Sequence, residues 1–314
     1  MSIPTSRAEE AALVTIDQEK CNGCGKCVSV CKDFEFKIVN GKAVLTDQPL
    51  FGCIACGHCM AICPEGAILV TGRSLSPNDL FTLSEQPLKP DYAALLQLLQ
   101  SRRSIREFKE QPVSREVIDL IISAAQTAPM GIPPSDVNLL VLDGKEKVRQ
   151  FSSDFCNLLD KNRWFVSGWF MALMAPFYDK KTMRFFKKFM RPVFDIYIGS
   201  MKIGEDVVTY NAPAAIYFYG SPFCDPADPI IAATYAMMAA ESLGLGSCML
   251  GAIHPFLQNG AVAAKFRNKY GIRFKSREGL VLILGYPKVQ YSRGIRRSFA
   301  NVDFFNTSSS APSA

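Results

Sequence analysis

The chain has 314 residues, a formal net charge of +6 at pH 7 and 48% hydrophobic residues. This length is sufficient for two domains, and the small basic excess, without a recognition motif, argues against nucleic-acid binding. The longest apolar run, residues 164–178, is shorter than the roughly 20 residues that span a membrane, so we expect no transmembrane helix.

The N-terminal residues 1–12 are polar and charged. Export signals contain an apolar core, so we do not expect this segment to direct export. Proteins that stay in a reducing compartment keep their cysteines as thiols. We therefore expect a cytoplasmic protein without a disulfide framework.

Eight of the eleven cysteines form two runs with the same C-x2-C-x2-C-x3-C spacing. The first run is Cys21, Cys24, Cys27 and Cys31, and the second is Cys53, Cys56, Cys59 and Cys63. This spacing lets three thiolates of one loop bind a [4Fe–4S] cluster while the fourth reaches the neighbouring cluster. We therefore expect two clusters, with Cys63 completing the first set and Cys31 the second. Zinc is the alternative, but it usually takes two separated C-x2-C pairs.

The region of residues 10–75 resembles the bacterial two-cluster ferredoxins. Proline follows the second run as in that family, whereas Lys32 follows the first. His58, between two cysteines, is expected to tune hydrogen bonding rather than to bind metal. Short strands are predicted at residues 13–17, 36–39, 43–45 and 67–70. Asn40–Gly41 joins the middle two as a hairpin, because both residues accept positive φ.

We place the cluster-binding domain at residues 1–75. Residues 76–90 are rich in Ser, Pro, Asn and Asp without a sustained period, which is typical of a linker. A second domain is expected at residues 91–306, followed by a disordered tail at 307–314.

Apolar residues recur at helical spacing from Tyr92 to Ser101. Three arginines and a hydroxyl follow directly: Arg102, Arg103, Ser104 and Arg106. Guanidinium groups and a hydroxyl can bind a phosphate through forked, charge-assisted hydrogen bonds. The alternative is a solvated basic end of the helix, which the helix dipole also favours.

Further elements alternate along the rest of the chain. Ser114 is expected to cap a helix that ends near Ala128, and a buried strand follows at residues 137–142. A second strand is predicted at 214–219 and a last one at 280–284. The helix that begins at Asp228 is apolar nearly all round, so it must lie inside the domain or between subunits.

The larger, C-terminal part of the chain is similar to the FMN-dependent nitroreductase family. The resemblance covers residues 90–300 and rests on an ordered set of segments: 102–108, 128–131, 211–213, 243–248, 285–287 and the closing arginines. It implies an α+β homodimer that binds FMN at the subunit interface.

The resemblance also implies roles for individual residues. Arg102, Arg103 and Ser104 would hold the phosphate, and Arg296 with Arg297 would close on it. Arg106 would face the N1 and O2 edge of the flavin, and the backbone of Leu250, Gly251 and Ala252 would approach N5. Pro129, Met130 and Gly131 would come from the partner chain.

Two regions depart from the family pattern or stay unexplained. Residues 130–137 lack the amide side chains that many family members place near the flavin ring. Residues 161–205 combine an aromatic run with two helical faces, one apolar and one basic. This stretch is interpreted as a dimer-packing and active-site-covering excursion, with an acidic redox partner or a membrane surface as alternatives.

The combined pattern predicts an FMN-dependent reductase. Single electrons from a low-potential donor such as ferredoxin would pass through the two clusters to FMN, which would reduce a nitroaromatic, a quinone or an activated alkene. No G-x-G-x-x-G motif opens a βαβ unit, so a dedicated nicotinamide-binding domain is not expected. The alternative is an electron-transfer or regulatory subunit that relays electrons to a partner protein. No catalytic side chain is assigned, because the chemistry belongs to the cofactors.

Overall fold

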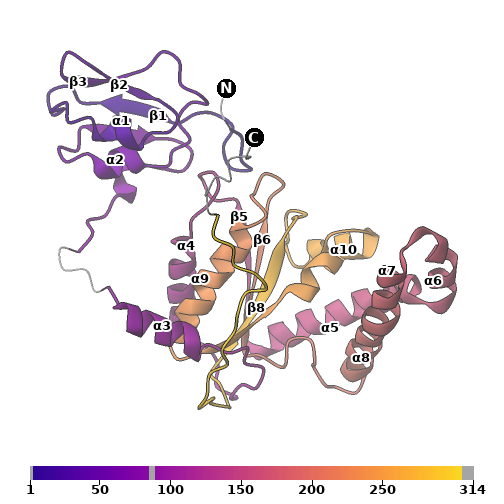
Figure 1. Ribbon diagram of the computed structural model, residues 1–314. Coiled ribbons are helices and arrows are strands. Elements are labelled where there is room, and N and C mark those ends of the chain that lie inside the picture. The colour runs from indigo at the N-terminus through magenta and orange to yellow at the C-terminus, as the bar shows by residue number, and fades with distance from the viewer. Residues whose placement is uncertain (1–2, 85–88, 306–314) are drawn as a thin grey trace, which may run out of the picture.

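The computed structural model describes residues 3–84 and 89–305, which form a small N-terminal domain and a larger C-terminal one (Figure 1). Each combines helices with strands, which confirms the predicted α+β class. Residues 85–88 of the expected linker and the whole expected tail, 307–314, lie outside the described residues. The described part of the linker includes a short 3-10 helix, η1 Pro77–Asp79.

The small domain, residues 3–75, is called the cysteine module below. Its elements are β1 Leu13–Ile16, α1 Lys26–Val30, β2 Phe36–Val39, β3 Lys42–Leu45, α2 His58–Ile62 and β4 Ile68–Thr71. β1 pairs with β4 and β2 with β3, both antiparallel. Asn40 and Gly41 make the predicted hairpin turn, with φ angles of 50° and 72°.

The larger domain is built around a four-stranded antiparallel sheet in the order β5-β6-β8-β7. Its strands are β5 Val137–Asp143, β6 Ala214–Gly220, β7 Gly246–Leu250 and β8 Gly279–Gly285. β6 and β8 lie in the middle and are buried along their whole length. The prediction of a buried strand at 137–142 was wrong in one respect: β5 is an edge strand, and only Leu142 in it is buried.

Helices cover both faces of this sheet (Figure 1). They are α3 Tyr92–Ser101, α4 Arg115–Gln126, α5 Lys145–Lys161, α9 Asp228–Ser242, η5 Gly251–Leu257 and α10 Ala261–Lys269. Successive side chains of a strand point to opposite faces. In β6, Ile216 and Phe218 pack with α4 and α9, whereas Tyr217 and Tyr219 pack with α5 and η5.

The segment between α5 and β6 projects from the sheet (Figure 1). Its elements are η2 Arg163–Val166, α6 Gly168–Met174, η3 Ala175–Phe177, α7 Lys180–Phe185, a π-helix Phe186–Met190 and α8 Arg191–Lys202. Trp169, Leu173 and Phe177 are exposed in it. No helix in the described part of the chain is long and apolar enough to cross a membrane.

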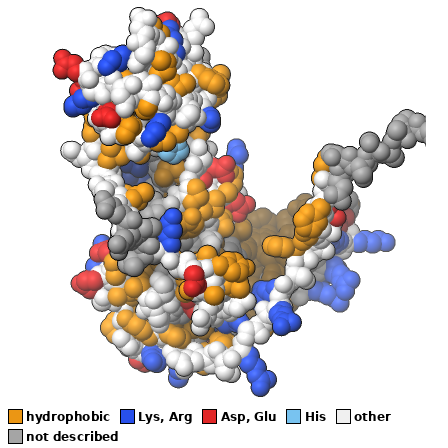
Figure 2. All heavy atoms as spheres, turned by 60° about the vertical axis from the view of Figure 1, so that its left-hand side comes forward, with side chains coloured by type: hydrophobic (Ala, Val, Ile, Leu, Met, Phe, Trp, Pro, Cys, Tyr) orange, Lys and Arg blue, Asp and Glu red, His pale blue; other side chains and the backbone are white. Residues whose placement is uncertain are grey.

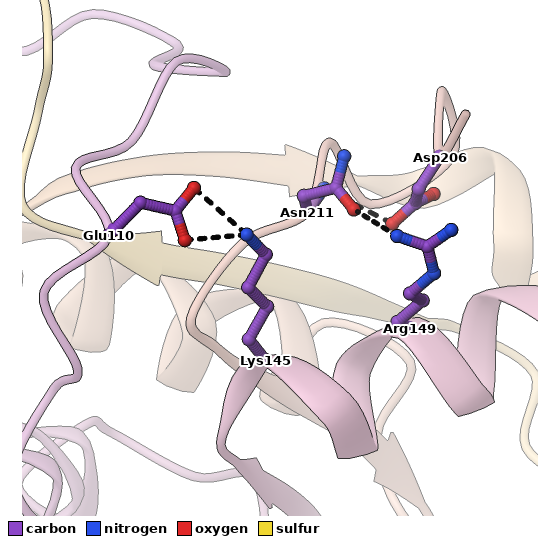
Figure 3. A network of polar contacts seen from close by, with 5 residues as sticks. All are labelled: Glu110, Lys145, Arg149, Asp206 and Asn211. Carbon is purple, nitrogen blue, oxygen red and sulfur yellow. Dashed lines mark hydrogen bonds and ion pairs between the residues drawn. The ribbon is translucent and has the colours of Figure 1, made fainter. Parts of the chain in front are cut away.

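A buried carboxylate fixes the turn that leads into β6. Asp206 accepts hydrogen bonds from the hydroxyl groups of Ser152 and Thr209 and from the backbone N–H groups of Val208, Thr209 and Asn211. Arg149 donates to Oδ1 of Asn211 at 3.4 Å, and Lys145 pairs with Glu110 close by (Figure 3). The Asn211–Pro213 segment of the family pattern is therefore a structural turn.

Replacing Asp206 with Ala leaves several buried donors without an acceptor. We expect Asp206→Ala to lower the free energy of unfolding by about 2–4 kcal/mol, measured by denaturant titration. Asp119→Ala is the control, because it removes only an exposed ion pair with Arg115. Equal unfolding midpoints for the two variants would contradict this account of the turn.

Candidate functional site

The first group of cysteines lines a cavity within the cysteine module. Cys21, Cys24 and Cys27 of the first run meet Cys63 of the second run there. The backbone N–H of Ala43 donates to Sγ of Cys21 at 3.4 Å, and that of Ala67 donates to Sγ of Cys63 at 3.3 Å. The four thiols are the crossed set expected from the spacing.

The other four thiols line a second, larger cavity. Cys31 of the first run lies with Cys53, Cys56 and Cys59 of the second run. The helix after each cysteine loop begins at equivalent positions, because Gly25 and Gly57 both adopt left-handed backbone conformations with φ of 71° and 74°. A side chain at either position would strain the loop.

The surroundings of the thiols fit iron–sulfur clusters. Backbone N–H groups of Ala43 and Gly23 hold the pKa of Cys21 below its ordinary value, which favours the thiolate that binds iron. Burial raises the pKa of Cys59 to about 12, and binding of a metal would favour its thiolate form. All eight cysteines are free. Among the described residues, no three His, Cys, Asp or Glu are placed around a single ion. Each cavity brings four thiols together, which is the number of cysteine ligands that a [4Fe–4S] cluster takes.

The predicted phosphate segment lies against the start of β7. Ser104 forms a β-bridge with Ser247, and the N–H of Ile105 donates to the Ser247 carbonyl at 2.9 Å. A Cβ on Gly246 would lie 2.7 Å from Ile105, so only glycine allows this approach. Leu250, the last residue of β7, is thus three residues from this bridge. Gly251 and Ala252 follow it as exposed residues at the start of η5.

The arginines of this site have different environments. Arg103 donates to the carbonyls of Gln100 and Arg102 at 2.6 and 2.7 Å and to that of Arg293 at 3.4 Å. It therefore ties the C-terminal segment, which carries the exposed Arg296 and Arg297, to the phosphate segment. These last two arginines make no ion pair within the described residues.

Arg102 and Arg106 are the two side chains best placed to meet a ligand. Arg102 makes no ion pair or side-chain hydrogen bond within residues 3–84 and 89–305, which leaves its guanidinium free for an anion. Arg106 is exposed and lies over the ring of Tyr210 at 5.6 Å. Tyr210 lies in the turn built on Asp206 and has a positive φ of 56°. Ser104 is exposed beside them. Guanidinium and hydroxyl groups of this kind can bind a phosphate through charge-assisted hydrogen bonds.

The remaining predicted flavin residues lie elsewhere. The N–H of Gly131 donates to Asp228 at the first residue of α9. At the other end of the same helix, Ser101 donates to Glu241 at 2.9 Å, directly before Arg102. With a rise of 1.5 Å per residue, thirteen residues of helix separate these ends by about 20 Å. The structure therefore does not bring Pro129, Met130 and Gly131 of one chain to the arginines of that chain.

Sequence reasoning missed the residues that join the two domains. Arg73, buried in the module, donates to the Pro133 carbonyl at 2.8 Å. Asp136, buried in the larger domain, accepts from the N–H of Ser6 at 2.9 Å and from its hydroxyl at 2.5 Å. No local pattern marks these residues, because each partner lies at least 60 positions away along the chain.

Comparison with known proteins gives a family match for each of the two domains. The nitroreductase family profile matches residues 99–286, and a profile described as a 4Fe–4S dicluster domain matches residues 13–64. An FMN reductase [NAD(P)H] of Bacillus subtilis is 26% identical over 159 residues, which cover 51% of this chain and 54% of the relative. Ferredoxin-2 of Desulfomicrobium norvegicum is 52% identical over 31 residues, 10% of this chain and 52% of the relative. The chain thus spans about half the length of each of these two relatives.

Solved structures are similar to the larger domain. A nitroreductase with bound FMN from Bacteroides fragilis has a TM-score of 0.48 at 16% identity, covering 67% of this chain and 98% of its own. A nitroreductase with bound FMN from Desulfitobacterium hafniense has a TM-score of 0.46 at 21% identity, covering 66% of this chain and 97% of its own.

Because the cysteine sets are crossed, replacing Cys63 of the second run should damage the cluster held by the first run. We expect about eight iron atoms per chain in anaerobically purified protein, and Cys63→Ala should damage the cluster held by Cys21, Cys24 and Cys27. Iron analysis should then fall toward about four atoms. Cys156→Ala, at a buried cysteine of the larger domain, should leave the iron content unchanged. Zinc in the purified protein, or four irons in the unmodified chain, would refute two clusters.

Proposed function

The chain belongs to the nitroreductase family and carries a 4Fe–4S dicluster domain, and from this premise we propose that it is an iron–sulfur flavin oxidoreductase. Its cysteine module passes single electrons from a low-potential donor such as ferredoxin to FMN. A small organic acceptor, a nitroaromatic, a quinone or an activated alkene, is then reduced. The observation that carries the proposal is that buried Arg73 and Asp136 fasten the module to the larger domain.

The clusters, FMN and the protein have different roles in the proposed reaction, and these roles follow from their chemistry. When bound, two [4Fe–4S] clusters supply one-electron carriage, and FMN supplies the change between one-electron and two-electron chemistry. The eight cysteines hold the clusters, and their spacing in two crossed sets supports a count of two. The protein contributes binding, orientation and electrostatics, in keeping with the absence of an assigned catalytic side chain.

In this proposal the flavin phosphate binds at the start of the larger domain. Arg102 and Ser104 donate to it, because guanidinium and hydroxyl groups form charge-assisted hydrogen bonds with phosphate. Arg103 adds positive charge while it orders the segment through backbone carbonyls. Arg296 or Arg297 closes on the phosphate from the C-terminal segment, which Arg103 holds nearby.

The flavin ring is proposed to lie over the end of β7. Arg106 faces the N1 and O2 edge, where a cation stabilises negative charge on the ring. The backbone of Leu250, Gly251 and Ala252 approaches N5, supported by the exposure of Gly251 and Ala252. The guanidinium of Arg106 lies over the ring of Tyr210, and this contact would help to hold it on this side.

We further propose that the active form is a homodimer. Pro129, Met130 and Gly131 contribute to the flavin site of the partner chain, because α9 separates them from the arginines of their own chain. The C-terminal segment supports this proposal: it stands off the body of the protein in Figure 2, and Phe299, Phe304 and Phe305 are 84–92% exposed. Burial of such aromatic side chains against a second copy would stabilise the association.

Anaerobic turnover assays test the proposed reaction. The wild-type protein and Cys56→Ala are supplied with reduced ferredoxin or with NAD(P)H, together with a nitroaromatic, a quinone or an activated alkene. We expect ferredoxin-driven turnover in the wild type and its loss in Cys56→Ala, whose chemically pre-reduced flavin should still reduce the acceptor. Equal ferredoxin-driven turnover in both proteins would refute the electron path. Flavin reduction without turnover of any small acceptor would point to a relay toward a protein partner.

Loss of one phosphate ligand should weaken cofactor binding. Arg102→Ala removes charge-assisted hydrogen bonds worth about 1.5–3 kcal/mol, so we expect the Kd for FMN to rise by about 10–100-fold. Fluorescence titration of the apoprotein with FMN measures this change. Arg115→Ala, an exposed arginine on α4, is the control and should bind FMN like the wild type. An unchanged Kd in Arg102→Ala would favour a solvated helix end instead.

A further inference from the structure

The two cysteine cavities differ in what they face. The cavity of Cys21, Cys24, Cys27 and Cys63 is lined only by residues of the cysteine module. The cavity of Cys31, Cys53, Cys56 and Cys59 has a volume of about 760 Å³ and is lined by residues of both domains. From the larger domain it is lined by Ala128, Pro129, Met130, Gly131, Pro133, Pro134 and Ser135. Only the second set of thiols therefore opens toward the larger domain.

Matched positions in the two runs make the same distinction. Lys26 and His58 each follow a left-handed glycine and begin a helix. Lys26 lines the cavity inside the module, whereas His58 lines the cavity shared with Pro129 and Met130. Of the two matched positions, only His58 therefore shares a cavity with residues of the larger domain.

Hydrogen bonds hold the cysteine module against the larger domain around the shared cavity. Arg73 connects three segments, because its guanidinium donates to the carbonyls of Ile3 and Glu10 in the module and of Pro133 across the boundary. Asp136 accepts from Ser6 of the module and from Ser221, which follows β6. Bonds of this kind, made by the buried residues Arg73 and Asp136, restrict movement of the module relative to residues 128–135.

The position of residues 128–135 decides which flavin the module can reach. They lie at the N-terminal end of α9, about 20 Å along that helix from Arg102 of the same chain. In the proposed homodimer they meet the flavin that the partner's arginines bind. Electron transfer through protein weakens steeply with distance, so the nearer flavin is strongly favoured.

From this geometry we infer that the second set of thiols is the electron exit of the module, and that it serves the flavin bound by the partner chain. The inference rests on the proposed function and deepens it: each active site combines the arginines of one chain with the cysteine module of the other. One electron leaves the module at a time, and two such transfers, with protons from solvent, complete the reduction of one flavin.

Heterodimers purified through two different affinity tags test this crossed arrangement. In the first, one chain carries Cys56→Ala and the other Arg102→Ala. In the second, one chain carries both substitutions and the other is wild type. Loss of flavin absorbance is followed after anaerobic mixing with reduced ferredoxin, without any acceptor. Flavin occupancy and iron content are measured on each sample.

The two heterodimers give opposite results for crossed and uncrossed transfer. We expect the flavin of the first heterodimer to bleach at the wild-type rate, because the Cys56→Ala chain holds flavin beside an intact partner module. The flavin of the second should bleach far more slowly. The reverse pattern would overturn the inference. A wild-type homodimer whose flavin does not bleach at all would instead overturn the proposed function.

A photo-crosslinking amino acid at position 58 or 26 tests the exit face without any redox reaction. In place of His58 it should form crosslinks to peptides containing residues 128–135, and in place of Lys26 it should form none to the larger domain. Mass spectrometry of digested protein identifies the linked peptides. Crosslinks to residues 128–135 from position 26 but not from 58 would refute the assignment of the second set as the exit.

Discussion

The arrangement of the two domains depends on hydrogen bonds that the buried residues Arg73 and Asp136 make across the domain boundary. Arg7 also donates to the Ser135 carbonyl across this boundary, but that contact is exposed. Arg73 and Asp136 are each less than 10% exposed, and each bonds across the domain boundary. A buried charge without partners is costly, so these bonds favour one arrangement of the domains. That arrangement places the second cysteine set, and not the first, beside residues 128–135.

A second constraint is the length of α9. This helix packs on α4 and on the sheet, with Ala232, Ala233, Ala236 and Ala240 buried. The small alanine side chains let the helix lie close to its neighbours, and its length keeps the two halves of the predicted flavin site apart within one chain. The proposed homodimer joins these halves. The helix that builds the core therefore also separates the proposed electron exit of the module from the flavin of its own chain.

Much of the fold could be predicted from the sequence because its signals are local. The Asn40–Gly41 hairpin, the Ser114 cap and the continuous apolar strand β8 depend on residues close together in the chain. β7 was not predicted, because Gly244 and Gly246 interrupt its apolar pattern and Gly246 is needed for the approach of Ile105. The half-burial of β5 depends on its place at the sheet edge, which pairing over long distances decides.

In the candidate site, too, the features with a local sequence signal were predicted and those that depend on distant residues were not. The cysteine spacing predicted the two thiol groups that line the cavities, and the arginine segment was found as a cluster of charge. The contacts of Arg73, Asp136 and Asp206 were missed, since their partners lie far away or within an irregular turn and carry no periodic signal. The separation of Gly131 from Arg102 likewise became evident only once α9 was placed between them.

Rapid mixing of the oxidised wild-type protein with reduced ferredoxin tests whether electrons reach the flavin through the cysteine module. Cluster and flavin absorbance are followed at separate wavelengths under anaerobic conditions without an acceptor. If electrons pass through the module, cluster bleaching comes first and flavin bleaching follows as the clusters reoxidise. Flavin bleaching that begins before the clusters, and proceeds while they stay oxidised, would contradict this route.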